Sequence, residues 1–223
     1  MSFSKFAATA ALMAFAATSA VAGSINVVNH SFETLPPAGL PFGGCGAGCA
    51  YSIDAIPGWT TSGGSTGQFQ PGPSSGNFNY FNSVPDGLTV AYTNGGFISQ
   101  TVGATSVAGA TYTLSVDVGY RKDVPDPGVV TLLVNGVPTV ATGTALQNSG
   151  DWSVFTASYT ALTSGGPIEV LLSSNSSQGD FDNVLLSSTG VPEPEGWLLM
   201  LTGLAMTGTF LRTRRMLSSA RAV

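Results

Sequence analysis

Side chains that commonly carry catalysis are scarce in this 223-residue chain. His30 is the only histidine, and its position after a short apolar run favours a structural or solvent-facing role. The Gly-x-Ser-x-Gly pattern occurs at residues 63–67 and 72–76, but no helical period follows either serine, so neither is expected to form the nucleophile elbow of a hydrolase. No glycine-rich loop ends in Lys-Ser or Lys-Thr. A glycosidase needs only two carboxylates at a suitable separation, but no acidic residue stands in a context that suggests a raised pKa. The sequence therefore predicts a non-catalytic protein.

The two cysteines, Cys45 and Cys49, are separated by three residues. This spacing differs from the redox Cys-x-x-Cys motif, and two cysteines with one distant histidine give too few ligands for a zinc site. In an exported chain such a pair favours a local disulfide. A bridged pair also excludes a thiol nucleophile.

Aromatic side chains are the candidates for contact with a glycan, because sugar rings stack on flat apolar faces. The candidate ligand-binding residues are Trp59, Tyr80 in an aromatic loop, and Tyr120 beside Arg121. The alternative is that the large aromatics pack in the core or anchor loops, as they usually do.

Both ends of the chain carry export features. Lys5, an apolar alanine-rich run and a small-x-small site ending at Ala22 predict a signal peptide over residues 1–22. Near the other end, an uncharged apolar segment at residues 197–211 predicts one short transmembrane helix. As a helix it would cover roughly 22 Å, against about 30 Å for a hydrocarbon core, so it suits transient anchoring. The arginines after it predict that residues 216–223 form a cytoplasmic tail.

The C-terminal order of Pro192, Glu193 and Pro194, then the apolar segment, then Arg212, Arg214 and Arg215 resembles the PEP-CTERM sorting signal of exported bacterial proteins. The resemblance covers residues 191–215. It implies processing near the prolines by an exosortase-type membrane enzyme, after transient anchoring in the inner membrane, and delivery to the cell surface or extracellular space. The alternative is an ordinary C-terminal membrane anchor.

Residues 23–190 remain as one expected domain. They hold two of the seven basic residues and ten of the twelve acidic ones, a formal balance of −8. Such an acidic domain repels phosphate backbones, so no nucleic-acid partner is expected. The abundant Ser, Thr, Asn and Gln suit contact with neutral glycans and are equally compatible with a plain solvated surface.

Short runs with a period of two predict a β-sandwich. Residues 111–118 alternate apolar and polar side chains, and similar runs occupy residues 25–28, 89–93, 97–102, 152–160, 168–172 and 181–186. Asn135-Gly136 between residues 129–134 and 137–141 predicts a type I′ hairpin, with Pro138 at an edge or bulge. Residues 94–96 (Asn-Gly-Gly) predict a second hairpin. Residues 35–48 and 62–77, rich in Pro and Gly, are expected to be long loops.

The ordered motifs at residues 29–33, 56–59, 96–101, 110–114 and 181–184 resemble the galactose-binding-like jelly rolls, which include several carbohydrate-binding modules. The resemblance implies an all-β jelly-roll β-sandwich whose first and last strands lie side by side. It also implies a structural calcium ion between the two ends of the domain, with Glu33 and Asp182 as side-chain ligands and Asp180 as a possible third. Calcium takes six to eight oxygens. The alternative is that these acids cap loops or face solvent.

Together these features predict an exported, non-catalytic protein of the envelope or of an exopolysaccharide or biofilm matrix. Its expected partners are the exosortase-type enzyme and an exopolysaccharide. The first alternative is a glycan-binding module with a defined sugar site, and the second is a glycoside hydrolase.

Overall fold

The computed structural model describes residues 22–43, 45, 48–72, 80–124, 128–175, 177–190 and 204. Residues Ala22–Val191 form one compact unit. Apart from Ala22 and Leu204, the expected signal peptide and sorting signal lie outside the described residues. Within the described part, no helix has the length and apolar character needed to cross a membrane.

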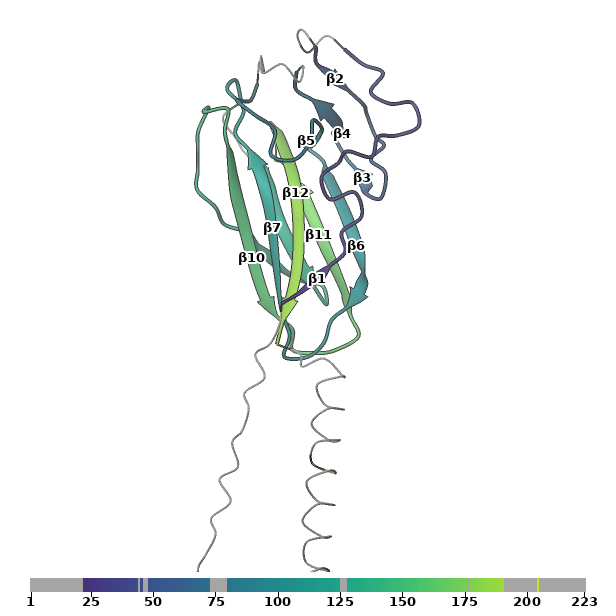
Figure 1. Cartoon of the computed structure of the whole chain (residues 1–223), viewed down its shortest axis with the longest axis vertical. Coiled ribbons are helices and arrows are strands. Elements are labelled where there is room, and N and C mark those ends of the chain that lie inside the picture. Colours follow the sequence, from purple (N-terminus) through teal and green to yellow (C-terminus); the bar gives the residue numbers. More distant parts are fainter. Residues whose placement is uncertain are drawn as a thin grey trace, which may run out of the picture. The chain divides into compact units, whose positions relative to one another are not determined.

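The domain is an all-β jelly-roll sandwich of two antiparallel sheets, as predicted (Figure 1). The seven-stranded sheet has the order β10-β7-β12-β5-β4-β2, and β1 pairs with β12 off this path. Its strands are β1 (Gly23–Ile25), β2 (Ala50–Tyr51), β4 (Ser65–Gln70), β5 (Val90–Asn94), β7 (Thr111–Gly119), β10 (Trp152–Thr160) and β12 (Gln178–Thr189).

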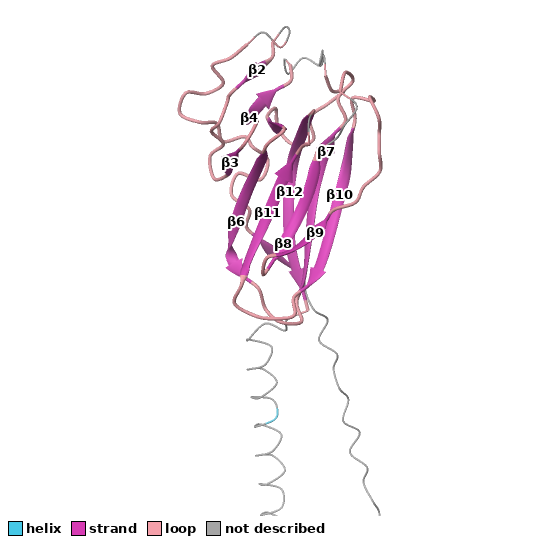
Figure 2. Ribbon diagram, turned by 180° about the vertical axis from the view of Figure 1, so that it is seen from behind, coloured by secondary structure: helices cyan, strands magenta, loops and turns pink. Residues whose placement is uncertain are grey.

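The five-stranded sheet has the order β3-β6-β11-β8-β9 (Figure 2). Its strands are β3 (Thr60–Ser62), β6 (Phe97–Thr105), β8 (Val129–Val134), β9 (Val137–Val140) and β11 (Pro167–Ser173). The first and last strands are neighbours, as expected, with Ser24 opposite Ser187.

The main core lies between the sheets and follows the alternation of the sequence. On β7, Tyr112, Leu114, Val116 and Val118 are buried in this core. The Asn135-Gly136 hairpin is also confirmed, because β8 and β9 pair around it and both residues have positive φ, 55° and 75°. This conformation suits a type I′ turn.

The hairpin predicted at residues 94–96 is wrong, because β5 and β6 belong to different sheets. The β3–β4 connection crosses between the sheets beside it. A Cβ at Gly96 would lie 2.1 Å from the Gly63 carbonyl oxygen, and one at Gly64 would lie 2.1 Å from the Asn94 oxygen. The two crossings therefore pack backbone against backbone, and only glycine allows this approach.

The prediction that residues 62–77 form one loop is also wrong, because Ser65–Gln70 form strand β4, which pairs with β5. In β4, the inward-facing Gln68 is fully buried, and its side-chain amide donates to the carbonyls of Phe32 and Thr34. Because a buried polar side chain interrupts the apolar alternation, the sequence pattern does not indicate this strand.

A second apolar cluster covers the opposite face of the seven-stranded sheet. Ala91 packs in the main core, whereas its neighbours Val90 and Tyr92 pack with Phe69, Phe81 and Cys49. Since alternate residues of a strand point to opposite faces, this cluster lies on the outer face. It is where the candidate site is built.

Candidate functional site

A cavity of about 390 Å³ lies on the outer face of the seven-stranded sheet. This is within the usual size range of small-ligand pockets. Strands β2, β4, β5 and β12 contribute to its walls, together with residues of the connections that follow β1, β2, β4 and β7. The lining residues are Gly43, Cys45, Tyr51, Ile53, Ser65, Phe69, Tyr80, Tyr92, Asn94, Arg121 and Gln178.

Four aromatic side chains dominate the cavity. Tyr92 meets Phe69 edge to face at 6.4 Å between ring centroids, and meets Tyr51 in the same way at 6.4 Å. Tyr80 lies 5.6 Å from Phe69. The Tyr92 hydroxyl donates to the carbonyl of Ser52 at 2.8 Å, which fixes its ring. Burial raises the pKa of Tyr92, so it stays neutral.

Arg121 supplies a charged group whose charge is locally balanced. Its Nε and Nη2 donate to the two carboxylate oxygens of Asp123 at 2.9 and 2.8 Å. Its guanidinium carbon lies 4.2 Å from the centroid of the Tyr80 ring, a cation–π arrangement. The hydrogen bonds from Arg121 lower the pKa of Asp123. This wall therefore offers planar and hydrogen-bonding surface with little net charge.

A buried carboxyl group lies behind the cavity wall. Asp180 is fully buried, its Oδ1 accepts a hydrogen bond from Gln178 at 2.8 Å, and its Oδ2 has no hydrogen-bond partner in the described part of the chain. Burial raises the pKa of Asp180 to about 7, against the charge of Arg121, which lowers it. The sequence around Asp180 does not indicate this raised pKa, because burial in the fold causes it.

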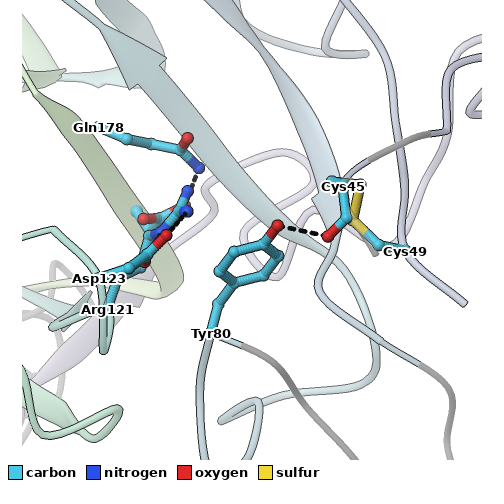
Figure 3. Close-up of a disulfide and its surroundings, with 7 residues drawn as sticks. Cys45, Cys49, Tyr80, Arg121, Asp123 and Gln178 are labelled. Atoms are coloured by element: carbon cyan, nitrogen blue, oxygen red, sulfur yellow. Dashed lines mark hydrogen bonds and ion pairs between the residues drawn. A yellow bond between two sulfur atoms is a disulfide. The ribbon is translucent and has the colours of Figure 1, made fainter. Parts of the chain in front are cut away.

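The predicted Cys45–Cys49 disulfide is present and forms part of the cavity rim (Figure 3). Cys45 lines the cavity, and the Tyr80 hydroxyl donates to its carbonyl oxygen. Beside the bridge, Phe42 and Tyr51 exchange two backbone hydrogen bonds of 3.1 and 2.9 Å. The disulfide loop is thus tied to the sheet on one side and to Tyr80 on the other.

Of the three aromatic residues predicted to contact a ligand, the structure brings Tyr80 to the cavity. Trp59 is 8% exposed, packs 5.3 Å from Phe32, and donates from its indole nitrogen to the Asn29 carbonyl at 3.3 Å. Tyr120 is 2% exposed. Trp59 and Tyr120 are thus buried packing residues, and neither lines the cavity.

Two of the three acids predicted to bind calcium, Glu33 and Asp182, hold a single loop, residues 86–89. Glu33 Oε1 accepts the backbone N–H groups of Leu88 and Thr89 at 2.8 and 2.6 Å. Asp182 Oδ2 accepts the N–H of Asp86 at 2.9 Å. Gly87 is required here, because its φ is +73° and a Cβ would lie 2.4 Å from the Glu33 carboxylate.

The surroundings of Glu33 and Asp182 can be compared with what a calcium site requires. Asp182 is fully buried, and burial raises its pKa to about 8, with Asp86 and Asp117 nearby as further acids. A cation would reduce the repulsion among these acids, but backbone N–H groups already donate to the carboxylates of Glu33 and Asp182. No group of three or more His, Cys, Asp or Glu residues suited to a metal occurs in the described part, and Asp180 contacts Gln178 instead. Calcium stays a prediction.

Comparison with known proteins gives one family. A family model described as HpiC1-like, HpiC1 cyclase, matches residues 23–187. None of the curated proteins matches the chain.

Two similar solved structures contain xylanase-associated modules. The CBM22-1–GH10 modules of the Clostridium thermocellum endo-1,4-β-D-xylanase 10B, complexed with xylohexaose, have a TM-score of 0.41 and 16% identity, over 61% of this chain and 26% of that one. The chain thus spans about a quarter of that structure. The CBM22-1 xylan-binding domain of Paenibacillus barcinonensis Xyn10C has a TM-score of 0.41 and 13% identity, over 73% and 94%.

Proposed function

The chain belongs to the HpiC1-like family, and we propose that its outer-face cavity binds a neutral glycan unit. The observation that carries the proposal is the lining itself. Tyr51, Tyr80 and Tyr92 combine flat aromatic faces with the amides of Asn94 and Gln178. Pockets of this kind bury apolar ring faces while a few polar groups fix orientation, and a sugar ring offers both apolar faces and hydroxyls.

Charge favours a neutral ligand over an acidic one. Arg121 is paired with Asp123 at 2.8 Å, and the domain carries ten acidic residues against two basic ones. An anionic glycan would approach against this field. A neutral ligand avoids that repulsion and can still accept hydrogen bonds from the pocket amides.

We place this module outside the cytoplasm, in the envelope or an exopolysaccharide matrix. The support is the signal peptide predicted at residues 1–22 and the sorting signal predicted at residues 191–215. The Cys45–Cys49 bridge is compatible with an oxidising compartment. In this proposal an exosortase-type enzyme processes the tail, and the released domain holds polysaccharide without acting on it.

The family description supports a second candidate, an enzyme that closes a ring. The observation that favours it is Asp180, whose pKa of about 7 keeps a large fraction of the carboxyl protonated near neutrality. A neutral carboxylic acid can act as a general acid when it is within hydrogen-bond reach of the reacting group, directly or through a water, and Asp180 contacts the cavity-lining Gln178 at 2.8 Å. Binding remains the better-supported function, because the lining residues that the structure describes include no carboxylate or histidine.

A glycan array with residues 23–190 tests the first proposal, because this fragment contains all the described strands and both apolar clusters. We expect selective binding to a small set of neutral glycans. Silence on the array would contradict the sugar site. Incubation of the same protein with a retained glycan, followed by mass analysis, tests chemistry: a product lost in Asp180→Asn would favour the enzyme.

A further inference from the structure

The disulfide loop contacts the side chain that forms one wall of the cavity. Cys45 lines the cavity and is half-buried, whereas Cys49 is 7% exposed and packs in the outer-face cluster. The bridge therefore connects the rim of the cavity to the apolar layer beneath it. Figure 3 shows Tyr80 pointing its hydroxyl at Cys45.

Tyr80 is held at both ends of its side chain. Its hydroxyl donates to the carbonyl oxygen of Cys45, and its ring lies under the Arg121 guanidinium at 4.2 Å. Arg121 is 11% exposed and is fixed from the other side by Asp123. A chain of direct contacts thus runs from the disulfide through Tyr80 to Arg121.

We propose that the Cys45–Cys49 disulfide is a positioning element of the cavity, whose Tyr80–Arg121 wall is formed only in the oxidised protein. The proposal rests on the proposed function only for what the cavity binds. Its ligand affinity then follows the thiol–disulfide balance of the compartment that surrounds the protein.

The redox step is an exchange with a dithiol reductant. One thiolate of the dithiol attacks Sγ of Cys45, the Cys45–Cys49 bond breaks, and Cys49 leaves as a thiolate. The second thiolate then attacks the mixed disulfide, which releases Cys45 and oxidises the dithiol to its own disulfide. Both cysteines take up a proton, so two electrons and two protons pass to the protein.

The effect should be local because the bridge closes a short loop. The cysteines are four positions apart, and the stabilisation that a disulfide gives by constraining the unfolded chain is smaller for shorter loops. The core between the sheets includes neither cysteine. Reduction should therefore free the Cys45 carbonyl from Tyr80 while the sandwich stays folded.

Arg121 gives a ligand-free readout, because it is the one arginine in residues 23–190. Its Nε–Hε signal in a ¹⁵N correlation spectrum is thus assigned without ambiguity, and the ring current of Tyr80 shifts it. We expect the signal to move on reduction with a phosphine, toward its position in Tyr80→Ala. Tyr80→Phe, which keeps the ring and loses the hydroxyl, should move it in the same direction without reductant.

The double variant Cys45→Ser with Cys49→Ser provides the control. It should show the reduced-state signal and no response to the phosphine, and its melting temperature should stay close to that of the oxidised protein. An Arg121 signal unchanged by reduction and in the double variant would overturn the inference. Unfolding of the whole domain on reduction would also overturn it, because the disulfide would then stabilise the entire domain and not only position Tyr80. Neither outcome depends on whether a glycan binds.

Discussion

The carboxylate of Asp182 accepts the backbone N–H of Asp86 at 2.9 Å, although 96 positions separate the two residues. Glu33, near the other end of the domain, accepts the N–H groups of Leu88 and Thr89 from the same loop. The segment after the first strand and the last strand are therefore both fastened to residues 86–89. Acid–base equilibria at this point should affect the stability of the whole domain.

We predict that, with calcium removed by a chelator, the domain becomes less stable as the pH rises from about 4 to about 8. Burial raises the pKa of Asp182 to about 8 and that of Asp180 to about 7, from 3.8. Burial also raises the pKa of Asp117. The folded protein thus holds protons that the unfolded chain has released, so stability falls across this window. The melting temperature should be higher at pH 5 than at pH 8.

Asp182→Asn is the matched variant for this prediction, because an amide cannot ionise. It should flatten the pH dependence of the melting temperature. Asp123 acts in the opposite sense, because Arg121 lowers its pKa. Its contribution to stability is lost only as the pH falls below the ordinary pKa of an aspartate, 3.8. A melting temperature that rises from pH 5 to pH 8, or a slope unchanged in Asp182→Asn, would refute the assignment.

Calcium should raise the melting temperature if it binds at Glu33 and Asp182. Because calcium requires the ionised carboxylate, the gain should be larger at pH 8 than at pH 5. An ion that binds only the folded state stabilises it by about 2.7 kcal/mol at a hundredfold excess over Kd. Thermal melting with calcium, with magnesium and with chelator measures this gain. Equal melting temperatures in calcium and chelator at pH 8 would exclude the site.

Arg121→Lys should lower the free energy of unfolding by about 1 kcal/mol, because lysine cannot make the bidentate contact with Asp123 or stack in the same way on Tyr80. The estimate is modest because the Asp123 side chain is 52% exposed. Urea denaturation measures it. The double variant with Asp123→Asn should lose less than the sum of the single variants, whereas additive losses would show that the ion pair contributes nothing.

The C-terminal segment should be removed from the mature protein. Arg212, Arg214 and Arg215 are predicted to hold the C-terminus in the cytoplasm, and processing near residues 192–195 would release the domain. Mass spectrometry of the extracellular protein should find no peptide that spans residues 193–211. Recovery of such peptides from the final extracellular material would rule out processing.

Much of the sandwich could be predicted from local sequence because its strands bury one face. The alternation of β7, the limits of β10 at Trp152–Thr160 and the Asn135-Gly136 turn all follow from backbone geometry. The disulfide followed from the number and spacing of the cysteines. These features depend on near neighbours in the chain, so a single sequence carries them.

The cavity could not be predicted in the same way, because long-range contacts build it. Tyr92 and Phe69 are on the outer face of the sheet, where alternation predicts solvent exposure, and the loops that cover them come from distant positions. Consecutive burial of Val90, Ala91 and Tyr92 follows from this cover. An apolar, uninterrupted strand was the available signal. The raised pKa of Asp180 also needs the fold, since burial causes it.

The most direct test of the proposed site is calorimetric titration of residues 23–190 with the glycan that binds most strongly on the array. Wild type, Tyr80→Ala and Phe97→Ala should be compared, because Phe97 is 39% exposed and does not line the cavity. Loss of one stacked aromatic contact, worth about 1.5 kcal/mol, should weaken binding roughly tenfold in Tyr80→Ala and leave Phe97→Ala unchanged. Wild-type affinity in a folded Tyr80→Ala would contradict the assignment of this cavity as the glycan site.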